Sequence, residues 1–350
     1  MSAEQVNTNA EMSIHEAERI EDALLNVNVS PHMHAKDSVS KIMWTVVVAL
    51  APAAIFGMIH FGLHAVLIIF SGMVSAVLFE AAVQKIRGQI TIYDGSAALT
   101  GLLLAMCLPP TVPLFIPIVG SFIAIVIVKF SMGGLGHNFF NPAHIGRAAL
   151  LVSWPTLMTK WSETKTAVDA VTSATPLNIL KNNGYDQLIT TYGSKEKLYE
   201  ALFFGMRNGS IGETCTILLL LGGAFLIYKK YIDWTIPVCM IGTVGVLTFV
   251  CGPKGLFTGD PIFHMMAGGL ILGAFFMATD MVTTPITRKG RVIFAIGAGC
   301  LTVLIRLIGG YPEGVCYSIL LMNAVTPLID LLVRPKVFGR RNKQHVRASR

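Results

Sequence analysis

The sequence predicts an all-α integral membrane protein with about ten transmembrane helices, which form two inverted five-helix repeats with short or broken helices. Its composition is the first observation behind this fold class. Of the 350 residues, 53% are hydrophobic and only 13% are charged, and the mean hydropathy is +0.63. So few charged side chains cannot cover a soluble globule of this length, whereas they suit a chain surrounded by a lipid bilayer.

The second observation is a series of apolar runs, which charged residues separate from Lys41 onward. A helix needs about 20 residues to cross a bilayer. The predicted spans are 42–60, 63–83, 95–109, 112–130, 142–156, 211–228, 234–252, 262–280, 292–308 and 314–333. The runs 95–109 and 142–156 are short, and four prolines interrupt the uncharged stretch from 95 to 128. We therefore expect broken helices in this region.

The third observation is a pair of matches between the two halves. Residues 101–113 (GLLLAMCLPPTVP) align without gaps on 273–285 (GAFFMATDMVTTP), with glycine and proline at the two ends. Residues 125–136 (IVIVKFSMGGLG) resemble 301–312 (LTVLIRLIGGYP), and in each segment one cation precedes a Gly-Gly pair. Chance similarity between segments rich in glycine, leucine and isoleucine is the alternative, but both matches occur in the same order. Inverted repeats form the transport pathways of many membrane proteins near the midplane.

Lysine and arginine are concentrated in alternate connections, and this sets the predicted orientation. One set of connections contains Lys36, Lys41, Lys85, Arg87, Lys229, Lys230, Arg288, Lys289, Arg291 and the C-terminal cluster. The short loops of the other set contain only Lys254 and Arg306. Both termini are therefore expected in the cytoplasm. The two copies then run in opposite directions, because Lys129 ends an outward-to-inward helix and Arg306 ends an inward-to-outward helix.

These expectations divide the chain into a cytoplasmic N-terminal segment (1–40), a first repeat (41–156), an external loop (157–210), a second repeat (211–333) and a basic cytoplasmic tail (334–350). The first segment is acidic and polar and has no apolar core, so it is not a signal peptide. We expect the tail to flank the cytoplasmic surface of the lipid bilayer rather than to bind nucleic acid.

The cysteines and histidines give no metal site. The six cysteines lie apart with no C-x-x-C spacing, mostly in apolar runs, so we expect packing residues. A metal cluster shared with another subunit is the alternative. His32 with His34, and His60 with His64, have spacings that a metal could use, but a third ligand is not apparent.

The segment GGLGHNFFNP (133–142) resembles a nucleotide-binding loop only superficially. It follows a membrane span rather than the strand of a βαβ unit, so the required context is missing. We expect its glycines to allow a tight re-entry of the chain. Asn138, Asn141 and His144 then become polar packing residues or cofactor contacts.

The nonapeptide DAVTSATPL (169–177) lies in the predicted external loop, a few residues from the membrane surface. Its simplest interpretation is a turn before a short helix. It contains no N-x-[ST] glycosylation signal, and no histidine lies near it in sequence to activate a nucleophile. Its small residues lead us to expect an accessible Thr175.

The pattern D-x-x-[ST]-x-A-T in this nonapeptide resembles a known flavinylation motif. It consists of Asp169, Thr172, Ala174 and Thr175. The motif belongs to the membrane subunits shared by Rnf and Na+-translocating NADH:quinone oxidoreductase complexes. There a flavin transferase joins FMN through its phosphate to the last threonine, which implies Thr175 as the acceptor. Ser173 stands where glycine is common, a mild departure because serine is also small.

Further blocks are similar to that family in the same order, over residues 30–340: SPHMHAKDSVSKIM, DGSAALTGLLLAMCLPP, GGLGHNFFNPAHIGRA, GAFFMATDMVT and GGYPEGV. The length and the short N-terminal extension resemble the Rnf-type members. The resemblance implies a subunit of an ion-translocating ferredoxin:NAD+ oxidoreductase complex in a bacterial or archaeal cytoplasmic membrane. It also implies covalent FMN and a second, non-covalent flavin, riboflavin.

Such a subunit is not catalytically complete by itself. The chain has no soluble nucleotide-binding domain and no cysteine pattern for its own iron–sulfur cluster, so other membrane and iron–sulfur or flavin subunits must deliver electrons. The sequence leaves the coupling ion open between Na+ and H+. It also leaves the riboflavin contacts unassigned.

Acidic residues in or beside membrane spans are candidates for the ion pathway, because an uncompensated charge there is costly. Glu80 lies in the second span, Asp280 ends the block GAFFMATD, and Glu313 follows the second Gly-Gly pair. The alternative is that each of these residues faces the membrane interface. Two other functions remain open for the chain: a quinone-reductase subunit of the same family, or a redox-inactive solute channel or transporter.

Overall fold

The computed structural model describes residues 37–88, 91–161, 174–252, 255–257 and 259–334. The chain divides into two units at Ser38, and all features below belong to the second unit, which begins at Val39. In the described ranges the fold is helical, apart from a small antiparallel hairpin of β1 (Cys251–Gly252) and β2 (Gly255–Leu256). The prediction of a helical membrane protein is confirmed. Four of these helices are long and apolar enough to cross a bilayer: α2 (Val39–Phe61), α3 (Leu63–Arg87), α14 (Arg288–Leu307) and α15 (Val315–Leu332).

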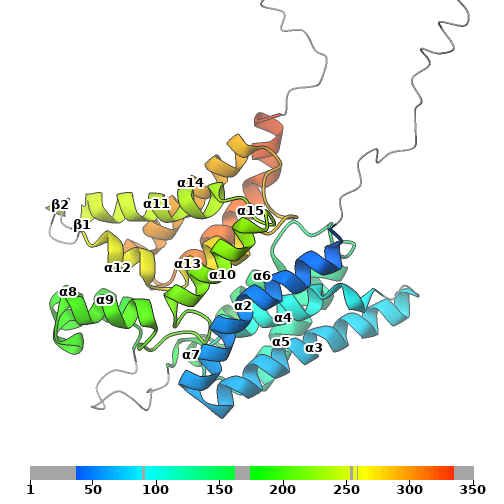
Figure 1. The fold of residues 1–350 in the computed structure, drawn as a ribbon, viewed down its shortest axis with the longest axis horizontal. Helices are drawn as coiled ribbons and strands as arrows, with labels where there is room; N and C mark the ends of the chain where they lie inside the picture. Colours follow the sequence, from blue (N-terminus) through cyan, green and yellow to red (C-terminus); the bar gives the residue numbers. More distant parts are fainter. Residues whose placement is uncertain (1–36, 89–90, 162–173, 253–254, 258, 335–350) are drawn as a thin grey trace, which may run out of the picture. The chain divides into compact units, whose positions relative to one another are not determined.

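The first group of helices contains α2, α3 and several shorter elements, which Figure 1 shows in blue to green. The short 3₁₀ turn η1 (Ile92–Asp94) leads into α4 (Ser96–Met106). Helix α5 (Phe115–Phe122) continues as the π-helical segment η2 (Ile123–Phe130), and α6 (Pro142–Ser153) follows. α3 packs against α4 and α5, and α6 packs against α5 and η2. A Cβ on Gly101 would overlap the carbonyl oxygen of Gly72, so α3 and α4 touch at their backbones.

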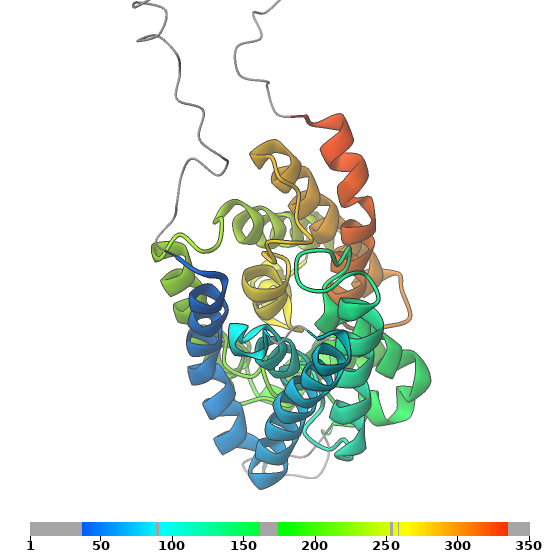
Figure 2. The same cartoon turned by 90° about the vertical axis from the view of Figure 1, so that its right-hand side faces the viewer.

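The second group contains α14, α15 and the elements before them in the chain, and Figure 2 shows it from another side. These elements are α10 (Thr216–Tyr228), α11 (Thr235–Val250), α12 (Pro261–Met266), α13 (Leu270–Leu272) and the π-helical segment η3 (Gly273–Met277). α11 packs against α14 and α12, and α14 packs against α15. α10 joins the two groups, because it contacts α2 as well as α13 and η3.

Three helices lie between the two groups in the chain: α7 (Pro155–Thr159), α8 (Pro176–Tyr192) and α9 (Lys195–Phe204). α8 packs on α9, and α9 packs on α10 and α12 (Figure 1). α8 has a kink at Gly184, whose φ of 85° suits glycine. A separate apolar core holds α8, α9 and α12 together; it contains Leu177, Ile179, Leu188, Leu198, Leu202, Phe263 and Ala267.

The expected break after the first short span is confirmed. α4 ends at Met106, and its last carbonyl groups lie inside the helix bundle. The backbone N–H of Gly212 donates to the carbonyl of Met106 (2.7 Å), and that of Ile211 donates to the carbonyl of Leu108 (3.1 Å). Broken helices persist at membrane depth only where other groups satisfy the freed backbone in this way.

A second break divides the predicted span 262–280. α12 stops at Met266 and α13 starts at Leu270, with Gly268 and Gly269 at φ values of 68° and 64° between them. This left-handed conformation ends a helix, and glycine adopts it without steric cost. The run was predicted as one helix because its hydrophobicity is continuous, and hydrophobicity carries no information on the turn.

Candidate functional site

Thr175 is the N-cap residue of α8, so it lies at the start of this helix rather than in a free loop. Its backbone is extended (φ −68°, ψ 154°), and its Oγ1 accepts a hydrogen bond from the backbone N–H of Asn178 at 3.3 Å. Pro176 follows at the first helical position. Threonine followed by proline is a favourable start for a helix. Ala174 precedes it, whereas Asp169, Thr172 and Ser173 lie outside the described residues.

The expectation of an accessible Thr175 is wrong for this conformation, because the residue is only 4% exposed. Its neighbours Pro176 and Leu177 are also buried, and Leu177 belongs to the apolar core with Phe263. Small side chains allow neighbouring segments of the protein to pack closely against the backbone, as readily as they allow solvent to reach it. An enzyme that modifies the hydroxyl must therefore meet the chain before α8 packs, or must open the start of α8.

The start of α8 suits a phosphate group. The first backbone N–H groups of a helix lack intrahelical acceptors, and the helix dipole favours negative charge at this end. The Thr175 hydroxyl is already held there by one such group, on Asn178. A phosphate group on Oγ1 would therefore lie at the end of α8 that favours negative charge.

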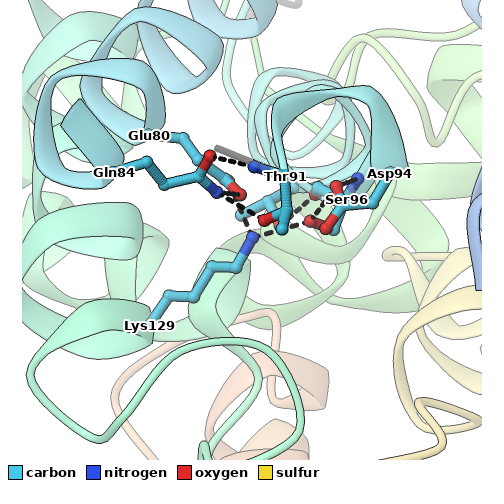
Figure 3. A network of polar contacts seen from close by, with 7 residues as sticks. Glu80, Gln84, Thr91, Asp94, Ser96 and Lys129 are labelled. Atoms are coloured by element: carbon cyan, nitrogen blue, oxygen red, sulfur yellow. Dashed lines mark hydrogen bonds and ion pairs between the residues drawn. The ribbon is translucent and has the colours of Figure 1, made fainter. Parts of the chain in front are cut away.

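Glu80, predicted as an ion-pathway residue, lies in a buried network at the end of α3 (Figure 3). Its side chain is 1% exposed and forms an ion pair with Lys129 of η2, at 2.7 Å between Oε2 and Nζ. Lys129 Nζ also donates to the hydroxyl of Ser96 at 2.6 Å, and Gln84 donates to Glu80 Oε1 at 2.9 Å. A charged pair at this depth is retained only with such additional hydrogen bonds.

The network continues from Ser96 toward the surface of the described structure. Asp94 Oδ1 accepts from both the hydroxyl (2.7 Å) and the backbone N–H (2.8 Å) of Ser96. Gln84 donates to Thr91 Oγ1 at 2.8 Å and accepts from the Thr91 backbone at 2.6 Å. Thr91 is exposed and Asp94 is half-buried. Hydrogen bonds therefore connect the buried Glu80 carboxylate to groups that reach the edge of the bundle (Figure 3).

Asp280 lies across a cavity from this network. The residue follows η3 and is half-buried, and its carboxylate accepts from Thr283 Oγ1 at 3.3 Å. A cavity of about 90 Å³ has Ser96, Lys129 and Asp280 in its wall, together with the amides of Asn138 and Asn141. This volume can hold water. The structure thus brings two of the three predicted ion-pathway residues, Glu80 through Lys129 and Asp280 directly, to one cavity, whose wall is otherwise mostly apolar.

Glu313, the third candidate, lies elsewhere. It precedes α15 and forms an ion pair with Arg147 of α6, with both side chains 12% exposed. It lines a different cavity from the one that contains Lys129 and Asp280. The sequence did not predict Arg147 as its partner, since the two residues are far apart in the chain.

Glu213 is a buried acid that the sequence-based prediction missed. It is 4% exposed, and a Cβ on Gly269 would lie 2.7 Å from its Oε1, so it lies beside the break between α12 and α13. Its own backbone carbonyl accepts from Arg207 at 2.5 Å. The signal was present, because Glu213 is an acidic residue inside the predicted span 211–228.

The structure also gives the surroundings of the other sequence motifs. Gly133, Gly134 and Gly136 have φ values of 115°, 101° and 93°, so the glycines of 133–142 do form a tight turn of the chain. Asn141 caps α6 and donates to the carbonyl of Met277 at 3.2 Å. His64 contacts the carbonyl of Val112 at 2.9 Å, and no metal-ligand cluster occurs in the described residues. His32 and His34 lie outside those residues. All six cysteines are free, and three of them are buried.

An acidic residue outside the membrane spans fixes the helices that follow Thr175. Asp260 accepts hydrogen bonds from the hydroxyls of Tyr185 (2.7 Å) and Tyr199 (2.7 and 2.8 Å), and Lys195 Nζ lies 3.6 Å away. Burial raises the pKa of Asp260, but the two tyrosines, the backbone N–H of Phe263 and Lys195 together lower it below its usual value. This carboxylate joins α8 and α9 to the start of α12.

We expect Asp260→Asn to lower the stability of this part of the fold at pH 7 by about 2 kcal/mol, because hydrogen bonds to a charged acceptor are lost. The folded pKa of Asp260 is depressed, so its contribution is present above the unfolded pKa of about 3.9 and disappears as the pH falls through the folded pKa. Thermal unfolding of the two proteins should therefore differ fully at pH 7, and the difference should shrink progressively as the pH falls below about 3.9. Glu200→Gln, at an exposed residue of α9, is the control. A constant difference at all pH values would contradict this account.

Comparison with known proteins places the chain in a family. Residues 26–339 match the NQR2, RnfD, RnfE family. The chain belongs to this family. One relative is a subunit of the proton-translocating ferredoxin:NAD(+) oxidoreductase complex of Clostridium ljungdahlii. It is 64% identical, over 92% of this chain and 98% of that protein.

Two further relatives in the family carry similar descriptions. The corresponding subunit of the Na(+)-translocating ferredoxin:NAD(+) oxidoreductase complex of Acetobacterium woodii is 45% identical, over 90% of this chain and 95% of that protein. The subunit from the ion-translocating oxidoreductase complex of Stutzerimonas stutzeri is 39% identical, over 87% and 93%. The predicted resemblance is therefore confirmed across nearly the whole chain.

Proposed function

We propose that this chain is the membrane flavoprotein subunit of an ion-translocating ferredoxin:NAD+ oxidoreductase complex, and that it relays electrons through FMN on Thr175. The 64% identity to a subunit with that description supports the complex. The observation that carries the flavin assignment is the position of Thr175 at the start of α8, where its hydroxyl accepts from the backbone N–H of Asn178 at the helix end that favours a phosphate.

The residues of this chain hold the flavin in position and do not themselves oxidise a substrate. Bound FMN accepts and donates electrons, and a covalent link keeps it from dissociating. Thr175 would hold the phosphate, while Asp260 fixes α8 and α9 against α12 and so limits the movement of the anchor. Iron–sulfur and flavin subunits of the same complex would deliver and remove electrons, and a flavin transferase would attach the FMN.

We place the ion pathway at the cavity between Lys129 and Asp280. Glu80 and Asp280 are acids within or beside spanning helices, and such residues commonly mark ion paths. Lys129 neutralises Glu80, so a redox-linked shift of Lys129 would expose a carboxylate to the cavity. The coupling ion is H+ or Na+, since the two Clostridium and Acetobacterium relatives differ in this respect.

We further propose that the two helix groups are the inverted five-helix repeats. Aligning residue 101 with 273 places Ser96, the first residue of α4, opposite Gly268, which lies two residues before the start of α13. Lys129 donates to Ser96, and Arg306 donates to the carbonyl of Gly268 at 3.2 Å. In each helix group, the cation that precedes the Gly-Gly pair (Lys129 or Arg306) thus contacts the aligned residue (Ser96 or Gly268) of the same group.

The remaining features of the proposal concern orientation and the second flavin. We place both termini in the cytoplasm, the network of Glu80 at the cytoplasmic end of the spanning helices, and α8 on the extracytoplasmic side of the membrane. The parts are those expected from the sequence: 1–40, 41–156, 157–210, 211–333 and 334–350. Riboflavin is proposed as a second, non-covalent flavin, without assigned residues.

The proposal is tested by deleting the chromosomal copy and restoring it on a plasmid. Membranes of the deletion strain should lose ferredoxin-dependent NAD+ reduction and the linked ion uptake, and the plasmid copy should restore both. Restored quinone reduction by NADH in the assembled complex would indicate the quinone-reductase alternative. Unchanged redox activity together with lost solute uptake would indicate the solute transporter.

A further inference from the structure

A cavity of about 320 Å³ adjoins the start of α8; it is separate from the cavity of Lys129 and Asp280, and Glu313 lies in its wall. It touches the face of α8 that carries Asn178 and Asn182. Asn178 connects it to Thr175, because its backbone N–H binds Thr175 Oγ1 while the residue lines the cavity. The volume lies in the range of small-molecule sites, about 300 to 1,000 Å³.

Aromatic side chains from two distant segments contribute to the wall. Trp161 precedes the undescribed segment, and Tyr311 and Tyr317 lie around the start of α15. The rings of Tyr311 and Tyr317 are 5.8 Å apart and inclined by 31°. Aromatic faces favour stacked contacts with flat conjugated rings, and the tyrosine hydroxyls leave one end polar.

The polar groups in the same wall include several donors. The amides of Asn178 and Asn182 and the guanidinium of Arg147 line the cavity. Glu313 pairs with Arg147, yet the buried Nε of Arg147 has no hydrogen-bond partner among the described residues. A buried donor without an acceptor is unfavourable, so this atom indicates a ligand with an acceptor at that position.

We propose that this cavity binds the isoalloxazine ring of the flavin attached to Thr175, with Arg147 and the two asparagines as donors to the polar edge of the ring. The inference rests on the proposed flavin attachment. A flat ring with an aromatic end and a hydrogen-bonding end matches a cavity with aromatic walls and a cationic donor. Glu313 lies in the same wall and offsets the charge of Arg147, so Arg147 acts toward the ring as a hydrogen-bond donor through its free Nε.

A second cavity, on the other face of α8, is the alternative place for the ring. It contains Lys181, His264 and Arg306. Its aromatic residue is Tyr185, whose hydroxyl is bound to Asp260. This cavity therefore offers cations but less aromatic surface.

The test compares neighbouring residues of α8 in the full chain, co-expressed with a flavin transferase. Asn182→Asp adds a negative charge to the cavity wall, and Asn183→Asp adds the same charge one residue further along, at an exposed site outside the cavity. Both residues are exposed, so both variants should fold. We expect Asn182→Asp to lower the flavin midpoint potential clearly and Asn183→Asp to change it little.

A second measurement uses Trp161→Leu and iodide quenching of the native flavin fluorescence. In the parent the ring should be shielded, with quenching several-fold weaker than after denaturation, and the variant should show brighter and more readily quenched flavin. Either of two results would overturn the cavity assignment alone. One is covalently attached flavin that shows full iodide quenching. The other is an equal shift of the midpoint potential in the two aspartate variants. A parent chain with no covalent flavin would instead overturn the proposed function.

Discussion

Replacing Thr175 by alanine is expected to abolish covalent flavin attachment while the chain remains folded. Alanine has no hydroxyl to form a phosphoester. It also removes the hydrogen bond with the N–H of Asn178, and loss of such a helix cap costs about 1 kcal/mol. That loss is small beside the packing of the buried helices. The measurement is flavin fluorescence of the denatured chain in a gel, with intact mass, after co-expression with a flavin transferase.

Two variants serve as controls for this experiment. Thr175→Ser keeps a hydroxyl and a helix cap, so flavin attachment should persist at a reduced level. Thr191→Ala removes a hydroxyl from an exposed residue later in α8 and should leave attachment unchanged. If the parent chain carries no flavin beside a transferase that modifies another substrate, the flavin assignment is wrong, and the redox-inactive transporter becomes the leading function.

Replacing Lys129 by methionine is expected to have the largest effect on stability. It leaves Glu80 buried without its cation, and breaking a buried ion pair on one side costs about 3 to 5 kcal/mol. We expect a marked fall in the thermal unfolding midpoint of the purified complex. The double variant Glu80→Gln with Lys129→Met removes both charges, so it should recover much of this loss.

Ion transport by the double variant then distinguishes a structural pair from a pathway. If the pair belongs to the pathway, the complex with the double variant should assemble and fold but fail to couple electron transfer to ion uptake in proteoliposomes. Transport at the parent level would show that the pair is structural. Lys85→Met removes an exposed lysine near the end of α3 and should change neither stability nor transport.

The sequence predicted one buried acid, Glu80, but neither its ion-pair partner nor the second buried acid, Glu213. Glu80 was identified because an acid within an apolar helix is conspicuous, and its burial agrees with this. Its partner could not be identified in the same way. Lys129 lies on η2, and the contact depends on the packing of that segment against α3. Glu213 was missed although it lies inside a predicted span, because only the structure shows that it lies beside Gly269, at the break between α12 and α13.

By itself, the sequence determined the helical membrane class, the broken helix before the prolines, the family and the candidate acceptor Thr175. These follow from hydrophobicity, proline chemistry and short motifs, which are local properties of the chain. The tertiary structure decided that Thr175 is buried, that a second break occurs at Gly268 and Gly269, and that Lys129 neutralises Glu80. Each depends on residues distant in the chain, because burial and charge neutralisation are set by which helices pack together.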